Sequence, residues 1–165
     1  MTSPLVQDLL TTAQNFWLMK TEPGECSIDD VLNAPDHQVS WFGIRNYQAR
    51  NFMRDDMRIG DAVLFYHSSC PKPGIVGLAR IASAPYPDEL QFDKSSEYYD
   101  AKSRPESPRW LTINVQALSK CDLIPLTALR GQEKLAAMRI LQKGNRLSIT
   151  PVTRDEFAFI THQLM

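Results

Sequence analysis

Cysteine is scarce in this chain, with only three residues among 165, Cys26, Cys70 and Cys121. No two of them form a Cys-x-x-Cys pair, and no two histidines lie at the spacing of metal ligands. Disulfide-bonded small folds and structural zinc sites both need closely or regularly spaced cysteines. The sequence therefore argues against a disulfide framework and against a metal site, and we predict no cofactor.

An excess of positive charge is also missing, because 18 Lys and Arg residues face 19 Asp and Glu residues. Proteins that grip long duplexes electrostatically are usually strongly basic, so any contact with nucleic acid should be small and local. No segment approaches the ~20 apolar residues of a membrane span. Gln7 and Asp8 interrupt the one apolar stretch near the N-terminus. We therefore expect a cytosolic protein, or a nuclear one if its source has a nucleus, without a membrane partner.

The length and the hydrophobic fraction of 43% fit one compact domain. Residues 1–15 show no clear hydrophobic period and are expected to form an N-terminal arm, loose or a short surface helix, ahead of a domain over 16–165. Short apolar runs are interleaved with capped helical patterns, without the regular alternation of a doubly wound sheet. The expected fold class is α+β, a mixed β-barrel surrounded by helices. Strands are predicted at 16–19, 62–67, 75–81, 110–116 and 147–149, and helices from 27, from 46, at 132–142 and from 153, with a short segment at 126–130.

The stretch from Trp41 to Asn51 gathers aromatic rings, amides and guanidinium groups within a few turns of backbone. Aromatic faces stack on nucleobases, an amide donates to and accepts from one base edge, and Arg binds phosphate through two hydrogen bonds. Each residue also has a structural alternative: Trp41 as a core residue, Asn46 as a helix N-cap, Arg45 or Arg50 as part of an ion pair. Their clustering within a few positions favours a binding role.

Polar groups at strand ends add further candidates. Lys20 ends the first strand, where it is either a solvated lysine or a contact for a phosphate or a base carbonyl. The run His-Ser-Ser-Cys at 67–70 suggests a base beside a nucleophile. An extended strand does not bring those groups face to face, and no third catalytic residue stands out. Trp110 is expected on the polar face of its strand.

Motifs spread over nearly all of the chain after residue 15 carry a resemblance to a known family. They lie at 16–23, 41–53, 60–61, 65–68, 84–88, 99–100, 108–110 and 146–151. On these motifs the sequence resembles the EVE domain family of the PUA-like superfamily. The resemblance implies a PUA-like barrel, related to ASCH and YTH domains, with a pocket for a modified nucleobase. For bacterial members the implied ligand is a modified cytosine or adenine in DNA, or a modified RNA base. The chain departs from the family at Phe42, where an acidic residue is common, so any base-edge contact of that carboxylate is lost.

We therefore expect a non-catalytic nucleic-acid-binding module that recognises a modified base, in DNA or RNA, flipped into an aromatic pocket. The alternatives are an enzyme acting on a nucleotide or modified base, and a protein-interaction module that uses the same aromatic residues. Nothing in the sequence demands more than a monomer. The predicted ligand-binding residues are Lys20, Trp41, Arg45, Asn46, Tyr47, Arg50, Asn51, Tyr66, His67, Ser68, Trp110 and Ser148.

Overall fold

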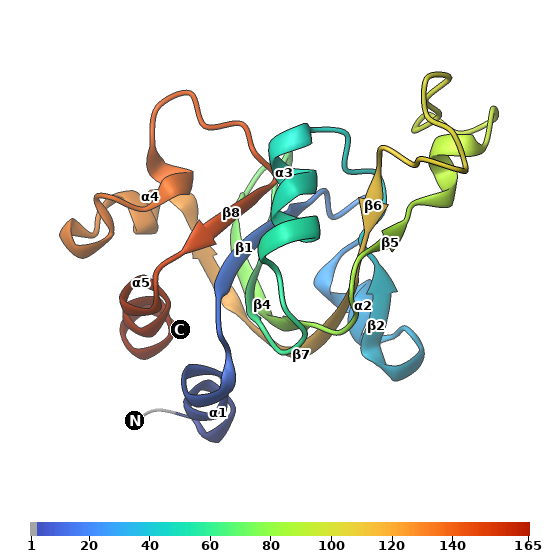
Figure 1. Cartoon of the computed structure of the whole chain (residues 1–165). Helices are drawn as coiled ribbons and strands as arrows, with labels where there is room; N and C mark the ends of the chain where they lie inside the picture. Colours follow the sequence, from blue (N-terminus) through green and yellow to red (C-terminus); the bar gives the residue numbers. More distant parts are fainter. Residues whose placement is uncertain (1–2) are drawn as a thin grey trace.

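Strand β1 (Phe16–Thr21) lies inside the main sheet because both of its faces are apolar. In the computed structural model, which describes residues 3–165, β1 pairs parallel with β3 (Ala62–His67) and antiparallel with β8 (Ile149–Val152). The six-stranded sheet has the order β2-β7-β4-β3-β1-β8 (Figure 1). Its other strands are β2 (Gln38–Ser40), β4 (Gly74–Ile81) and β7 (Asn114–Pro125), and β5 (Tyr86–Pro87) pairs with β6 (Leu111–Thr112) in a separate small sheet.

Helices cover both faces of the sheet, and successive residues of β1 point to opposite faces. Trp17 and Met19 enter one buried cluster with residues of α2 and α3, while Phe16 and Leu18 enter a second cluster with α1, α4 and α5 (Figure 1). The α-helices are α1 (Pro4–Thr12), α2 (Ile28–Leu32), α3 (Tyr47–Asn51), α4 (Leu126–Arg130) and α5 (Arg154–Phe159). Single 3-10 turns lie at Pro35–His37, Glu89–Phe92, Glu133–Leu135 and Arg139–Leu141, and π-helical turns at Phe52–Asp56 and Ile160–Leu164.

A buried carboxylate ties the start of β1 to the turn before β3. Asp61 is 0% exposed and accepts hydrogen bonds from the indole Nε1 of Trp17 at 2.9 Å and the backbone N of Arg58 at 2.9 Å. The backbone N and side-chain Nδ2 of Asn15 donate to the same carboxylate, at 3.1 and 3.0 Å. These four donors offset the cost of burying a charge, so Asp61 fixes where the two parallel strands start.

The mixed α+β class predicted from the sequence is confirmed, whereas the closed barrel is not. Within residues 3–165 the ladder runs from β2 to β8 without pairing these two edge strands, so closure into a full barrel is not confirmed. The capping residues Ser27, Asn46 and Thr153 do begin α2, α3 and α5, as their side-chain hydrogen bonds show.

Other local expectations were wrong. The helix predicted at 132–142 is two 3-10 turns separated by Met138, whose backbone is extended (φ −62°, ψ 133°). This break lets Leu135, Met138 and Ile140 all bury in the cluster with α4 and α5. The strand predicted at 147–149 begins only at Ile149 and continues to Val152.

The N-terminal segment contributes to the core. Ser3 caps α1, whose Val6 and Leu9 are buried in the second cluster, and the guanidinium of Arg154 donates to the carbonyl of Leu10. Residues 1 and 2 of the expected arm lie outside the described residues, and a domain boundary after residue 15 stays a prediction. Between residues 3 and 165, no helix is long and apolar enough to cross a membrane.

Substituting Asp61→Ala should strongly destabilise the fold, because it leaves the buried indole N–H of Trp17 and its neighbours without an acceptor. Each unsatisfied buried group costs ~1–3 kcal/mol, so urea unfolding should show a loss of at least ~2 kcal/mol. The control Asp56→Ala removes an exposed carboxylate from the neighbouring turn and should change stability by less than ~0.5 kcal/mol. Equal effects of the two substitutions would contradict this role of Asp61.

Candidate functional site

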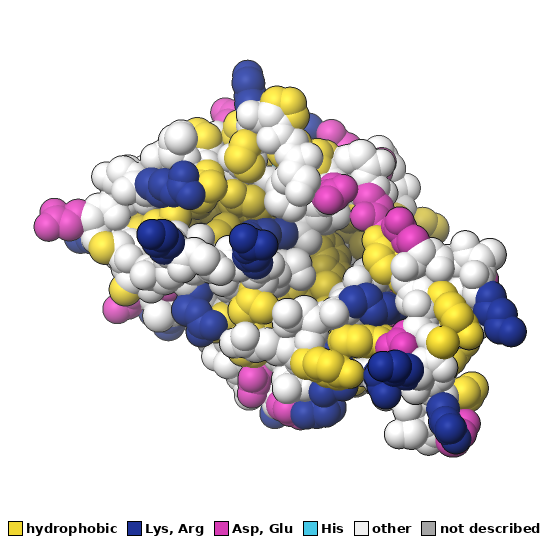
Figure 2. Space-filling view, turned by 90° about the horizontal axis from the view of Figure 1, so that it is seen from above, with side chains coloured by type: hydrophobic (Ala, Val, Ile, Leu, Met, Phe, Trp, Pro, Cys, Tyr) yellow, Lys and Arg dark blue, Asp and Glu magenta, His cyan; other side chains and the backbone are white. Residues whose placement is uncertain are grey.

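A cavity of about 490 Å³ opens where the ends of β1, β2 and β3 meet. Because β1 and β3 are parallel neighbours, their carboxyl ends lie at the same edge of the sheet, and the end of β2 with the residues that follow it, 39–44, also lines the cavity. Figure 2 views this face from above and shows an apolar hollow with Lys and Arg side chains on one part of its rim and Asp and Glu on another. The lining residues are Lys20, Thr21, Glu22, Glu25, Cys26, Val39, Ser40, Trp41, Phe42, Gly43, Ile44, Ser68, Ser69, Tyr98, Arg146 and Ser148.

Three aromatic side chains line the cavity, Trp41, Phe42 and Tyr98. Trp41 is only 6% exposed, and its indole packs edge-to-face on Phe65 with ring centroids 5.4 Å apart. Its backbone N donates to the carbonyl of Ile113 at 2.7 Å, which continues the pairing of β2 with β7. Core packing and backbone pairing thus hold Trp41 in one orientation at the cavity.

Tyr98 forms the second aromatic wall and comes from the long connection between β5 and β6. Its hydroxyl donates to Oε1 of Glu25 at 2.7 Å, and its ring packs edge-to-face against Phe42 at 5.9 Å. Burial, together with the hydrogen bond to Glu25, raises the pKa of Tyr98 above its ordinary value. The phenol therefore stays protonated and serves as a hydrogen-bond donor at neutral pH.

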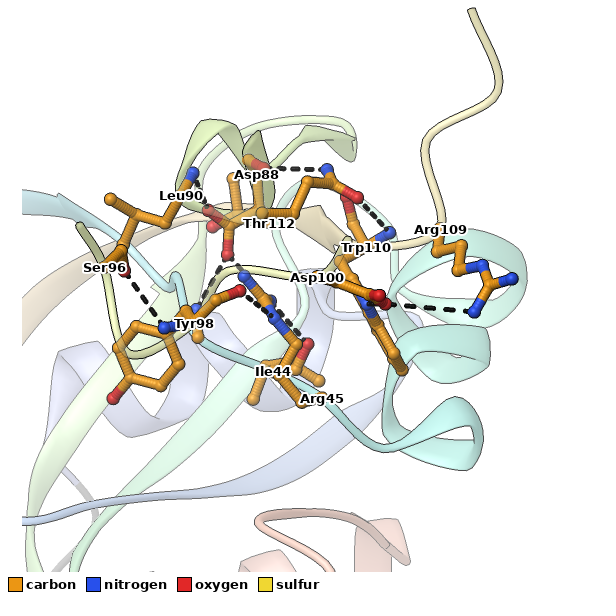
Figure 3. Close-up of polar contacts among 12 residues, drawn as sticks. Ile44, Arg45, Asp88, Leu90, Ser96, Tyr98, Asp100, Arg109, Trp110 and Thr112 are labelled. Atoms are coloured by element: carbon orange, nitrogen blue, oxygen red, sulfur yellow. Dashed lines mark hydrogen bonds and ion pairs between the residues drawn. The ribbon is translucent and has the colours of Figure 1, made fainter. Parts of the chain in front are cut away.

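The connection that carries Tyr98 is fastened to the segment between β2 and α3, as Figure 3 shows. The carboxylate Oδ2 of Asp88 accepts from the backbone N of Gly43 at 2.8 Å and from Nη1 of Arg45 at 3.1 Å. Nε of Arg45 also donates to the backbone carbonyl of Tyr98 at 3.0 Å. Since Gly43 has a φ of +86° and a Cβ there would lie 2.8 Å from the Tyr98 ring, only glycine fits this contact without strain.

Polar groups in the lining are mostly small hydroxyls and charges of both signs. Lys20 donates its backbone N to the carbonyl of Ser148 at 2.8 Å, and burial lowers the pKa of its side chain. The pKa of the Cys26 thiol is raised mainly by burial and also by the nearby carboxylates of Asp30 and Glu25. Little thiolate is therefore present at neutral pH. Within residues 3–165 there is no group of three or more His, Cys, Asp or Glu side chains placed to hold a metal ion.

The structure divides the residues predicted from the sequence into two main groups. Lys20, Trp41, Ser68 and Ser148 line the cavity. A second group lies beside the cavity rather than in it, and consists of Arg45, Asn46, Tyr47, Arg50, Asn51 and Trp110.

Several members of the second group have local partners. Asn46 accepts from the backbone N of Ala49 at 3.0 Å and so caps α3, and Asn51 accepts from the guanidinium of Arg50. The expectation that Trp110 lies on a polar face was wrong, because it is 5% exposed and its indole donates to Asp100 at 2.8 Å.

Tyr66 and His67 were expected at the cavity and do not line it. The side chain of Tyr66 is buried in the cluster on the other face of the sheet, because it alternates with Phe65, which supports Trp41. Nε2 of His67 accepts from the backbone N of Ile28 at 3.1 Å, and burial lowers the pKa of the imidazole. His67 is therefore neutral, with Nδ1 protonated, and orients the start of α2.

Sequence reasoning missed several lining residues that come from the loops, including Glu25, Gly43, Tyr98 and Arg146. The long proline-bounded connection that contains Tyr98 did carry a signal, since connections of that length are often lids or binding loops. No sequence pattern indicates which aromatic residue of this connection faces the cavity.

The model of the EVE domain matches residues 15–163 of the chain. The chain belongs to the EVE domain family. Mouse thymocyte nuclear protein 1 is 40% identical to this EVE domain over 164 residues, which cover 88% of this chain and 72% of the mouse protein. The resemblance drawn from the sequence motifs is confirmed.

Solved structures give the same result for the fold. A crystal structure of a Pseudomonas putida protein matches with a TM-score of 0.83 at 44% identity, covering 88% of this chain and 96% of that one. The human THYN1 protein, solved in complex with DNA containing 5-methylcytosine, matches with a TM-score of 0.83 at 38% identity, covering 90% of this chain and 96% of the human one.

Replacing Gly43 by alanine should strain the EVE domain and displace the Tyr98 wall. A non-glycine residue at positive φ costs ~1–2 kcal/mol, and ~1 kcal/mol corresponds to ~2–4 °C in a domain of this size. Differential scanning calorimetry should show Tm lowered by ~2–8 °C for Gly43→Ala. Gly24→Ala is the matched control, because a Cβ at Gly24 meets nothing within 4 Å. An unchanged Tm for Gly43→Ala would contradict the requirement for glycine.

Proposed function

We propose that this EVE domain is a non-catalytic reader of a modified base in nucleic acid, with 5-methylcytosine in DNA as the first ligand to test. The observation that carries the proposal is the human THYN1 protein, which has the same fold and was solved in complex with 5-methylcytosine-containing DNA. The cavity beside Trp41 supports the proposal from this chain's own geometry, because its volume of about 490 Å³ falls in the usual range for small-ligand pockets.

In this proposal the modified nucleotide leaves the base stack, and its base enters the cavity between Trp41 and Tyr98. Unstacking and unpairing cost a few kcal/mol. Contact between a base and an aromatic side chain contributes ~1–3 kcal/mol of binding free energy. Hydrogen bonds to the base edge offset the remaining cost of unstacking and unpairing. Lys20, Ser68 and Ser148 are the polar lining residues that we assign to that edge.

The methyl group limits how selective such a site can be. Burial of one methyl contributes ~0.8 kcal/mol, and since ~1.4 kcal/mol corresponds to a tenfold change in affinity, the methyl alone gives a preference of roughly fourfold. A larger preference needs an unsatisfied polar group or a clash with the unmodified base, at ~1–3 kcal/mol per unsatisfied group. We therefore expect a preference of at least fourfold for the methylated strand.

Two observations support a binding role over catalysis. The thiol in the cavity, Cys26, has its pKa raised by burial and is a weak nucleophile, and His67 has Nε2 engaged by the backbone of Ile28. Turnover of a modified nucleoside, followed by mass spectrometry, would contradict the assignment as a reader. A monomeric state and a cytosolic location stay predictions from the sequence.

Filling the cavity should remove recognition without removing the fold. We expect Ser148→Phe to lower affinity for an oligonucleotide with one 5-methylcytosine at least tenfold and to bring the preference over unmodified cytosine close to one. Thr127→Phe is the control, since it adds the same ring to the exposed face of α4, outside the cavity. Fluorescence anisotropy with labelled oligonucleotides measures both affinities, and circular dichroism checks the fold.

A second variant tests the aromatic wall itself. Trp41→Phe keeps an aromatic residue on Phe65 but reduces the stacking area, so affinity for the methylated strand should fall severalfold. Equal binding of methylated and plain strands by the unmodified protein, or full retention of the preference in Ser148→Phe, would reject the proposed function.

A further inference from the structure

Next to the cavity, three aromatic side chains and one arginine form a continuous ladder that ends at the surface. The ladder consists of Tyr98, Arg45, Trp110 and Tyr47. The guanidinium carbon of Arg45 lies 5.5 Å from the ring centroid of Tyr98 and 5.5 Å from that of Trp110. Figure 3 shows these three side chains next to one another. Tyr47 stacks on Trp110 with a centroid distance of 4.9 Å and an interplanar angle of 25°.

The two ends of the ladder differ in what they face. Tyr98 forms part of the cavity wall, whereas Tyr47 is 51% exposed on the first turn of α3. Arg45 in the middle is held by Asp88 and by the carbonyl of Tyr98, so the ladder is rigid between its ends. A large exposed aromatic ring, held flat by a stack beneath it, is a suitable platform for another planar group.

The exposed end carries positive charge that is only partly compensated. The guanidinium of Arg50 lies 4.8 Å from the Tyr47 ring and donates three hydrogen bonds, two to Asn51 and one to the carbonyl of Arg109. An Arg side chain has five N–H groups, so two remain for an incoming acceptor.

Two carboxylates near this end, Asp100 and Asp55, already have partners. Within residues 3–165 Arg50 makes no ion pair. Arg109 is 38% exposed and lies 3.9 Å from Asp100, which also accepts from the indole of Trp110. Asp55, on the following turn, is paired with Arg54.

We propose that Tyr47, Arg50 and Arg109, here called the Tyr47 surface, bind the DNA strand next to the flipped nucleotide. Arg50 and Arg109 contact its phosphates, and Tyr47 stacks on a neighbouring base. This inference rests on the proposed function, because it places the strand next to a base that occupies the cavity. The ladder joins the Tyr47 surface to the wall of that cavity. Charge complementarity and this continuity favour a nucleic-acid strand as the occupant, and contacts of this kind do not depend on methylation.

The test separates recognition of the base from binding of the strand. Affinities of Tyr47→Ala and Arg50→Gln are measured by fluorescence anisotropy for single-stranded oligonucleotides with and without 5-methylcytosine, over a range of salt concentrations. Tyr47→Ala should weaken binding of both strands by the same factor, about 5- to 100-fold, and leave the preference for the methylated strand unchanged. Tyr47→Phe should restore the affinity. Arg50→Gln should lower the slope of log affinity against log salt by roughly 0.7.

The controls are an exposed tyrosine and an exposed arginine away from the ladder. Tyr86→Ala on β5 and Arg80→Gln on β4 should leave affinity and the salt slope at their original values. This inference would be overturned if Tyr47→Ala and Arg50→Gln both left the affinity and the salt slope unchanged. If the preference for the methylated strand were intact in that case, the proposed function would still stand. If the original protein shows no preference for the methylated strand and Tyr47→Ala still lowers its affinity for both strands, the proposed function is overturned and the role of the Tyr47 surface is kept.

Discussion

The buried carboxylate of Asp88 holds together the two segments that make the candidate site. It is 2% exposed and accepts from the backbone N of Gly43 and Leu90 and from Nη1 of Arg45. Because hydrogen bonds to a charged group are strong in a low-dielectric surrounding, these contacts keep the long connection between β5 and β6 close to the segment after β2. One segment supplies Trp41 and the other supplies Tyr98, so the width of the cavity depends on this junction.

The arrangement separates two demands that a reader of nucleic acid has to meet. Selectivity for one altered base needs walls that are held in place, and the core packing of Trp41 and the hydrogen bonds that hold Tyr98 meet that need. Affinity for the strand needs cations and stacking groups that do not depend on the base sequence, and we assign this role to the Tyr47 surface outside the cavity. A local cationic surface of this kind is compatible with a formal net charge of −1 over the whole chain, because only a few phosphates are contacted.

The sequence predicted best where local chemistry decides the structure. The N-caps Ser27, Asn46 and Thr153 begin helices because their side chains satisfy nearby backbone N–H groups, and the apolar runs at 62–67 and 75–81 became neighbouring strands. The prediction of a helix at 132–142 was wrong, because a periodic apolar stripe also fits two short turns joined at an extended Met138.

The structure brings four of the predicted site residues to the cavity, Lys20, Trp41, Ser68 and Ser148, and places the others elsewhere. Trp41 and Ser148 line the cavity from positions next to strand ends, Trp41 just after β2 and Ser148 just before β8. Tyr66 does not, since neighbouring residues of a strand face opposite sides and the motif alone does not say which side is which. Tyr98 could not be placed, because its position depends on Glu25 and Arg45, which lie far from it along the chain.

The most direct test of the account is a crystal structure of this EVE domain with an oligonucleotide that carries one 5-methylcytosine. The account predicts that the methylated base lies outside the base stack, inside the cavity between Trp41 and Tyr98. A complex in which that base stays stacked in the strand, with the cavity beside Trp41 empty, would contradict it.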